Sequence, residues 1–218
     1  MLFSERQMQE MGRIVALSAM FLTACAAPVL EKDASYPADW PEIVGPTVEC
    51  STIGGTFLNK GVLVDNAGQT QPVWLTSLLP MSERTPANDP RAKERSALRS
   101  CERVNLQIEA VPWPDRPTSK FWQIVVSPSR QIDAGPPERW VPCEGFRLPI
   151  GRGWPFEGGL AAACAANGFF LIAEPGQIAP DTFELWLGRA SDGSLVARWT
   201  FGPTFATNHV WARFTKLP

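Results

Sequence analysis

The chain has 218 residues, of which 44% are hydrophobic and 19% are charged, and its formal net charge is −2. This composition is ordinary for a globular protein, and the length allows one sizeable domain. Because the charges nearly balance, no bulk basic field attracts nucleic acid, and we expect no nucleic-acid partner.

A short uncharged apolar run follows Arg13 and occupies residues 14–23. A bilayer-spanning helix needs ~20 apolar residues, so this run is too short to cross a membrane but fits the apolar region of a signal peptide. Leu22-Thr-Ala-Cys25 has the residue order of a lipobox, the site at which bacterial lipoproteins are cleaved and acylated. We therefore predict a lipoprotein signal peptide over residues 1–24 and lipid attachment at Cys25.

Cleavage of an ordinary signal peptide beside Ala24 or Ala26 is the alternative, and the start of translation stays open between Met1, Met8 and Met11. In a lipoprotein, two or more acyl chains such as palmitate anchor the cysteine stably in the membrane. The residue after Cys25 is Ala26. In lipoproteins that resemble this one, alanine rather than aspartate at this position is associated with location in the outer membrane. We therefore expect an outer-membrane anchor, with the domain facing the periplasm.

The stretch after the lipobox is interrupted by proline, which fixes φ and removes a backbone donor. We predict a tether over residues 25–46, beginning with the acylated cysteine, and a single β-rich periplasmic domain over residues 47–218. The prolines of the tether are Pro28, Pro37, Pro41 and Pro46.

The first part of the domain is predicted to hold short elements. Residues 55–61 suit a first strand, and residues 74–79 suit a short helix or a turn. Asp89 followed by Pro90 is the entry signal of a helix over residues 89–99, which is mostly polar and is therefore expected to be short and exposed.

Strands dominate the rest of the chain. Residues 104–110 and 121–127 alternate between apolar and polar side chains, which is typical of half-buried antiparallel strands. The small apolar stretch 158–166 stays open between a loop and a short buried helix. Further strands are expected at residues 143–148, 168–173 and 209–214.

A hairpin is predicted around Asp192-Gly193, a pair that favours a two-residue type I′ turn. Such a turn joins strands 183–190 and 195–201 and places Trp186 opposite Trp199. The predicted fold class is mainly β: an antiparallel sheet curled into a small barrel or a sandwich, with one or two short helices.

Removing Cys25 leaves an even number of cysteines, which in an oxidising compartment predicts two disulfides. Three pairings are possible. We favour Cys50–Cys101 with Cys143–Cys164, because the second pair brackets the turn 151–155. We expect no metal site, since no Cys-x-x-Cys occurs and the chain has one histidine.

His209 is the only histidine, so a Ser–His or Cys–His nucleophile would have to use it. It adjoins Asn208 at the edge of a predicted strand, where a surface role is the better interpretation. We expect no enzyme activity and no cofactor. The carboxylates available for paired-acid chemistry, which nothing in the sequence brings together, are Glu144, Glu157, Asp181 and Glu184.

A basic cluster is interleaved with glutamates, and we interpret it as a solvated face. Contact with anionic lipid headgroups is the alternative. The cluster consists of Arg91, Lys93, Arg95, Arg99 and Arg103.

Several short motifs together resemble uncharacterised proteobacterial lipoproteins. This resemblance implies a location at the membrane but no activity, and Cys101 and Cys164 lie outside the shared pattern. The motifs are Asp39-Trp-Pro41, Cys50, Gly55-Thr-Phe57, Asn59, Gly61, Cys143, Gly145, Ala190-Ser-Asp-Gly-Ser-Leu-Val196 and Trp211-Ala-Arg-Phe214.

Two functions are compatible with this sequence. The first is a structural or interaction module of the bacterial envelope, anchored through Cys25 and contacting an envelope protein or lipid. The alternative is a carrier of lipid or a small molecule, whose interior is lined by some of the 9 Trp and 12 Phe side chains. A large internal cavity would favour the carrier.

Overall fold

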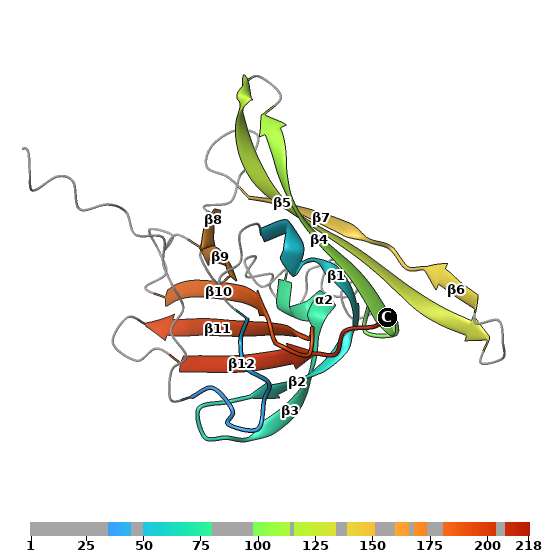
Figure 1. Ribbon diagram of the computed structural model, residues 1–218, viewed down its shortest axis with the longest axis vertical. Coiled ribbons are helices and arrows are strands. Elements are labelled where there is room, and N and C mark those ends of the chain that lie inside the picture. The colour runs from blue at the N-terminus through green and yellow to red at the C-terminus, as the bar shows by residue number, and fades with distance from the viewer. Residues whose placement is uncertain are drawn as a thin grey trace, which may run out of the picture.

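The computed structural model describes residues 35–44, 50–79, 98–113, 116–133, 139–150, 160–165, 168–173, 181–203 and 208–218. These residues form two antiparallel sheets with a common core between them (Figure 1). The mainly β prediction is therefore confirmed. The sheets do not close into a barrel, so the fold is sandwich-like.

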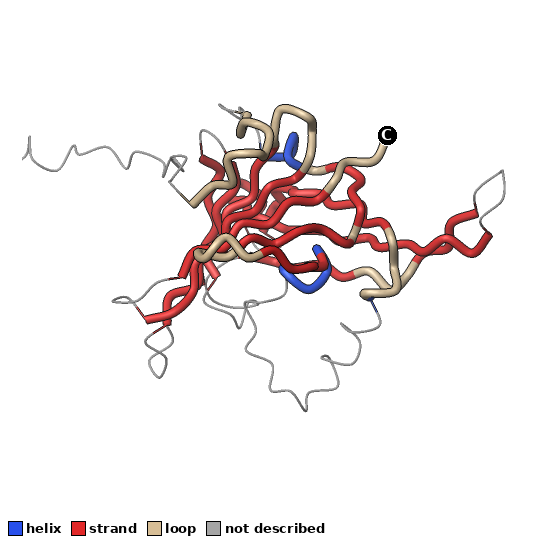
Figure 2. Tube along the Cα trace, turned by 90° about the horizontal axis from the view of Figure 1, so that it is seen from below, coloured by secondary structure: helices blue, strands red, loops and turns tan. Residues whose placement is uncertain are grey.

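The first sheet is built around the long strand β5 (Arg116–Asp133). One side of β5 pairs with β4 (Arg103–Trp113), which in turn pairs with β1 (Gly55–Leu58). The other side pairs with β7 (Phe146–Ile150) and, farther along, with β6 (Arg139–Pro142). Both views show the end of β5 that pairs with β6 reaching beyond the rest of the sandwich (Figures 1 and 2).

The second sheet has seven strands, and it is joined to the first at one corner. The chain passes from β1 to β2 through Asn59, and the C-terminal residues return to β1, where Leu217 N donates to Thr56 O at 2.8 Å. The strand order is β3 (Thr70–Trp74), β2 (Lys60–Val64), β12 (Asn208–Phe214), β11 (Leu195–Pro203), β10 (Asp181–Arg189), β9 (Gly168–Ala173) and β8 (Leu160–Ala165).

Two short helices lie beside the core, the 3-10 helix η2 (Cys50–Ile53) and α2 (Leu75–Leu78). The second decides between the two alternatives expected at residues 74–79, a short helix or a turn, in favour of the helix. All but the last two residues of the helix predicted over residues 89–99 lie outside the described part of the chain. No helix among the described residues is long and apolar enough to cross a membrane.

The core confirms the alternating patterns. Val104, Leu106 and Ile108 of β4 are buried, and so are Ile124 and Val126 of β5. Their partners across the core come from the second sheet and from the two helices, so strands far apart in sequence bury one common apolar interior. These partners include Phe169, Leu185, Leu187, Ala197, Ala212, Phe214, Ile53, Leu75 and Leu78.

The stretch predicted as a loop or a buried helix, residues 158–166, is instead largely strand, because Leu160–Ala165 forms β8. It pairs along its whole length with β9. Alanine favours helix when packing does not decide, so the pairing with β9 overrides local preference here.

The predicted hairpin exists, but its register is wrong by one residue. Trp199 pairs with Leu185, not with Trp186. The turn has three residues rather than two, because Ala190 and Ser194 form its closing pair and Gly193, with φ 80°, adds a bulge. A shift of one residue exchanges the faces of a strand, so Trp199 packs against the core while Trp186 lies on the outer face of the sheet.

Two disulfides are present as predicted, but the favoured pairing is wrong: Cys50 bonds to Cys164 and Cys101 bonds to Cys143. Cys143 and Cys164 belong to different sheets, which the symmetric spacing around a turn could not show. Cys101 precedes β4 and Cys143 follows β6, and the adjoining ends of these strands both pair with Ser129 of β5. The strand order therefore brings the two cysteines to the same end of the first sheet.

Candidate functional site

Residues 35–44, which we call the strap, cross the outer face of the second sheet (blue in Figure 1). Backbone hydrogen bonds fix one end of the strap to the end of β10. Val44 N donates to Arg189 O at 2.8 Å, and Ser191 N donates to Glu42 O at 2.8 Å. This part of the predicted tether is therefore packed against the domain.

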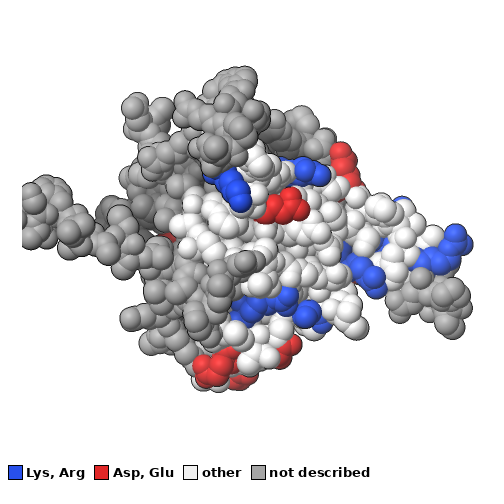
Figure 3. All heavy atoms as spheres, turned by 45° about the horizontal axis from the view of Figure 1, so that its top comes forward, with Lys and Arg blue, Asp and Glu red and all other residues white. Residues whose placement is uncertain are grey.

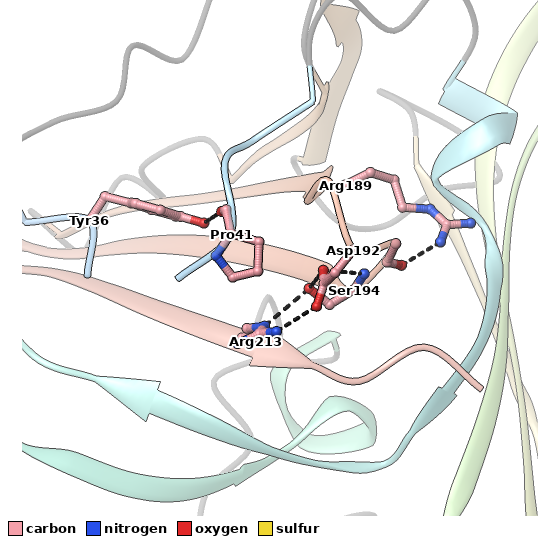
Figure 4. A network of polar contacts seen from close by, with 7 residues as sticks. Tyr36, Pro41, Arg189, Asp192, Ser194 and Arg213 are labelled. Carbon is pink, nitrogen blue, oxygen red and sulfur yellow. Dashed lines mark hydrogen bonds and ion pairs between the residues drawn. The ribbon is translucent and has the colours of Figure 1, made fainter. Parts of the chain in front are cut away.

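An aromatic cluster lies under the strap. Trp186 and Trp211 are fully buried, and Tyr36 of the strap contacts Trp211 edge to face with a centroid distance of 4.9 Å. The Trp211 indole donates to Ser35 Oγ at 2.9 Å, and the Tyr36 hydroxyl donates to Pro41 O at 2.5 Å (Figure 4). Burial raises the pKa of Tyr36 to about 12, so the phenol stays protonated as a donor. The strap is thus held by both packing and hydrogen bonds.

Two glycines make room for the Trp186 ring. A Cβ atom at Gly168 or at Gly188 would lie 2.2 Å from an atom of the indole. The ring therefore rests directly on the backbone of its own and the neighbouring strand, which explains why this large side chain fits between the sheet and the strap.

A groove of about 400 Å³ opens between the strap and the turn that joins β2 to β3. The turn is ordered by Asp65, whose Oδ1 accepts from Ala67 N at 2.9 Å and from Gln69 N at 2.8 Å. Aromatic, carboxylate, amide and hydroxyl groups meet in this groove. Its lining residues are Ser35, Tyr36, Pro37, Ala38, Asp39, Trp40, Val64, Asp65, Asn66, Gly68 and Thr70.

His209 and Glu184, two of the side chains considered for catalysis, share the outer face of the second sheet. Thr200 of β11 lies between them, since it pairs with Glu184 on one side and with His209 on the other. His209 Nδ1 lies 3.0 Å from Thr200 Oγ1, while Glu184 forms an ion pair with Arg198 at 3.7 Å. In a nucleophile–histidine–acid triad the acid bonds to the imidazole, so this order does not form one.

The structure does not place the other candidate carboxylates beside Glu184, Thr200 and His209. Glu144 is exposed between β6 and β7 of the first sheet. Glu157 and the side chain of Asp181 lie outside the described part of the structure. Within the residues that the structure describes, no group of three or more His, Cys, Asp or Glu side chains is placed to hold a metal ion.

A polar network next to the strap orders the turn between β10 and β11 (Figure 4). Asp192 Oδ1 accepts from the Ser194 hydroxyl at 2.6 Å, and Asp192 Oδ2 accepts from Arg213 at 2.5 Å. Arg189 donates to Gly193 O and to Gly54 O, each at 2.6 Å, and so ties this turn to the start of β1. We assign the network a structural role.

We expect Asp192 to stabilise the fold only above strongly acidic pH. Burial alone would raise the pKa of Asp192, but hydrogen bonds from Ser194 and Arg213 outweigh it and lower the pKa from 3.8 to about 2. A lowered folded-state pKa means that the stabilisation is complete above about pH 4 and is lost as the pH falls through 2. Because the pair is exposed, its contribution is that of a surface ion pair, below about 1 kcal/mol.

Urea denaturation of the wild type and of Asp192→Asn checks this expectation. The free energies of unfolding should differ at about pH 6 and nearly coincide at about pH 2. A difference that does not change with pH would show that ionisation of Asp192 contributes nothing.

The two described members of the predicted basic cluster contact different sheets. Arg99 lies over the Trp74 ring at 5.0 Å from its centroid, and Arg103 lies over the Trp140 ring at 3.2 Å. The other members, Arg91, Lys93 and Arg95, fall outside the described residues. On the face shown in Figure 3, basic and acidic groups are scattered over a largely uncharged surface.

Sequence reasoning missed the strap and its groove. The signal available was the presence of Tyr36 and Trp40 in a supposed tether, because disordered linkers contain few aromatic residues. Comparison with protein-family models, with curated proteins and with solved structures gives no match to this chain. Any functional conclusion therefore depends on the residues themselves.

Proposed function

We propose that this protein is a bacterial lipoprotein, anchored in the outer membrane through acylated Cys25. Its sandwich domain faces the periplasm and acts as a structural or interaction module of the envelope. The domain works by contact rather than by catalysis. The observation that carries the proposal is the lipobox ending at Cys25, followed at short distance by a strap that is packed on the domain.

The strap limits how far the domain stands from its anchor. Ser35 is held by Trp211, and the ~10 residues between Cys25 and Ser35 span at most ~35 Å even when fully extended. The acylated cysteine would therefore keep the strap and the adjoining groove near the membrane.

The disulfides support an exported protein. All four cysteines that follow Cys25 are paired, as Cys50–Cys164 and Cys101–Cys143. Such bonds persist in oxidising compartments and are rare in the cytosol.

The core supports the interaction module over the carrier. Among the described residues, side chains from both sheets pack together in the space between the sheets, with Phe57, Phe169 and Phe214 at 0% exposure. The groove described above lies outside the sandwich, between the strap and the β2–β3 turn. A carrier of lipid would need the interior space that these rings occupy.

Metabolic labelling with palmitate tests the proposal. We expect the wild-type protein to be labelled and to fractionate with the outer membrane, and Cys25→Ser to be unlabelled. Ala26→Asp is the matched variant: it should stay labelled but move to the inner membrane. An unlabelled wild-type protein, or one recovered free of membrane, would refute the anchor.

A further inference from the structure

The groove beside the strap contains hydrogen-bonding groups that the described residues leave unused. Asp39, Trp40, Asp65 and Thr70 line it, and Asp39 and Thr70 are exposed. No described residue forms a hydrogen bond with the Asp39 carboxylate, Oδ2 of Asp65, the indole N–H of Trp40 or the Thr70 hydroxyl. Two of these groups accept hydrogen bonds only, one donates only, and the hydroxyl does both. A few polar groups of this kind beside an aromatic surface are typical of a binding pocket.

The mixture of donors and acceptors restricts the ligand. A metal ion or an ammonium group accepts no hydrogen bond, so it would bind the oxygens of Asp39, Asp65 and Thr70 and leave the indole N–H of Trp40 without a partner. An anion would be repelled by Asp39 and Asp65. Hydroxyl groups both donate and accept, so an uncharged molecule with several hydroxyls matches the whole set.

The aromatic side of the groove also favours a ligand with several hydroxyl groups, namely a sugar. Trp40 is half-buried and is held edge to face against Tyr36, with a centroid distance of 5.9 Å. A ring fixed in this way offers an apolar surface at low entropic cost. The C–H face of a pyranose is apolar while its rim carries hydroxyls, and the groove of about 400 Å³ lies within the size range of ligand pockets.

We propose that the groove binds an uncharged oligosaccharide, with one sugar ring against Trp40 and its hydroxyls bonded to Asp39, Asp65 and Thr70. This inference deepens the proposed function, since it gives the envelope module a glycan as its partner. Binding of the sugar does not itself require acylation. An experiment can therefore refute the acyl anchor without refuting the sugar-binding groove, and the reverse also holds.

Calorimetric titration of the full-length mature protein tests the inference. The protein is kept in a zwitterionic detergent, because detergents with sugar headgroups would compete. The ligand is the uncharged, fully N-acetylated chitotetraose, which is called chitotetraose below. We expect saturable binding with a dissociation constant below about 1 mM. Thr70→Val should weaken it about tenfold, the effect of one lost hydrogen bond. Asp39→Asn should weaken it as well, because a neutral amide oxygen accepts a weaker hydrogen bond than a carboxylate does.

Glu109→Gln is the matched control, because it also removes an exposed carboxylate but lies on β4 of the first sheet. Its affinity for chitotetraose should equal that of the wild type. Competition by a neutral glycolipid, dissolved in the same detergent micelles, forms a second arm, with phosphatidylcholine in the micelles as its control. If the glycolipid does not displace chitotetraose, the groove is assigned to free glycan strands, and displacement by the glycolipid but not by phosphatidylcholine assigns it to glycolipid headgroups.

Three results would overturn the inference: no binding of chitotetraose, equal binding by both groove variants and the wild type, or tighter binding of spermine or of an anionic oligosaccharide. A protein that binds the sugar but carries no palmitate would refute the anchor alone. A palmitoylated protein that binds no sugar would refute the groove alone.

Discussion

Replacing Asn59 with aspartate is expected to destabilise the domain strongly near neutral pH, although the two side chains have almost the same size. Asn59 is 1% exposed and lies where the chain passes from the first sheet to the second. Its Nδ2 donates to Leu98 O at 2.9 Å and to Cys101 O at 2.8 Å. Its Oδ1 accepts from the backbone N and from the hydroxyl of Thr76, both at 3.1 Å.

The backbone of Asn59 is used just as fully. Its N–H donates to Glu102 O at 2.7 Å, and its carbonyl accepts from Leu75 N at 2.8 Å. One residue therefore joins the strand corner, helix α2 and the segment that leads into β4. An ionised carboxyl group here has no proton to donate and faces two carbonyl oxygens in a buried site.

The expected loss in the free energy of unfolding has two parts, one from acceptors left without a donor and one from the buried charge. Each buried acceptor left without a donor costs about 1–3 kcal/mol, and an unpaired buried charge adds to this. We expect Asn59→Asp to lose more than about 4 kcal/mol, a large fraction of the stability of an ordinary domain. Urea denaturation followed by tryptophan fluorescence measures the loss.

Two comparisons identify the cause. Asn66→Asp makes the same change in the exposed β2–β3 turn and should shift the free energy of unfolding by no more than about 0.5 kcal/mol. Burial raises the pKa of the carboxyl group introduced at position 59, so the deficit should shrink as the pH falls from 7 to 4. Equal effects of the two substitutions, or a deficit that is independent of pH, would contradict this account.

The part of the fold that the sequence predicts is the part set by local pattern. The alternation along β4 and β5 places Val104, Leu106 and Ile124 in the core, because the side-chain period of a strand is two whatever the strand pairs with. The sandwich-like fold, one of the two predicted alternatives, follows from several such strands and from short connections.

The features that the sequence does not predict depend on strand order. Nothing local shows that the carbonyls of Leu98 and Cys101 will meet Asn59, which lies 39 and 42 positions before them. The hairpin register depends on whether Ser194 closes the turn, and Arg213 from a different hairpin supports that geometry.

The candidate site was missed for the same reason. Its groove exists only because the strap packs on Trp186 and Trp211 and because the β2–β3 turn lies beside it. Each wall is ordinary on its own: one is a proline-containing segment and the other is an exposed turn. Their proximity is a property of the sheet, in which β2 and β12 are neighbours.

Removing the Cys50–Cys164 disulfide is expected to destabilise the protein more than removing Cys101–Cys143. The first bond closes a loop with a sequence separation of 114 residues and ties η2 to the edge strand β8, while the second closes a separation of 42 within one sheet. A disulfide stabilises a fold mainly by restricting the unfolded chain, and the restriction grows with the logarithm of the loop length.

The double variants Cys50→Ser/Cys164→Ser and Cys101→Ser/Cys143→Ser isolate each bond. On this argument the first loses about 4–5 kcal/mol, and the difference between the two variants is about 0.9 kcal/mol. Both variants keep Cys25, so each is prepared in the same form as the wild type, and urea denaturation gives the free energies of unfolding. Single serine variants would leave a free thiol able to exchange, so the double variants are the proper comparison. If loss of the shorter loop proved more costly, native-state contacts around Cys101, next to the Asn59 hydrogen bonds, would outweigh the entropy of the unfolded chain.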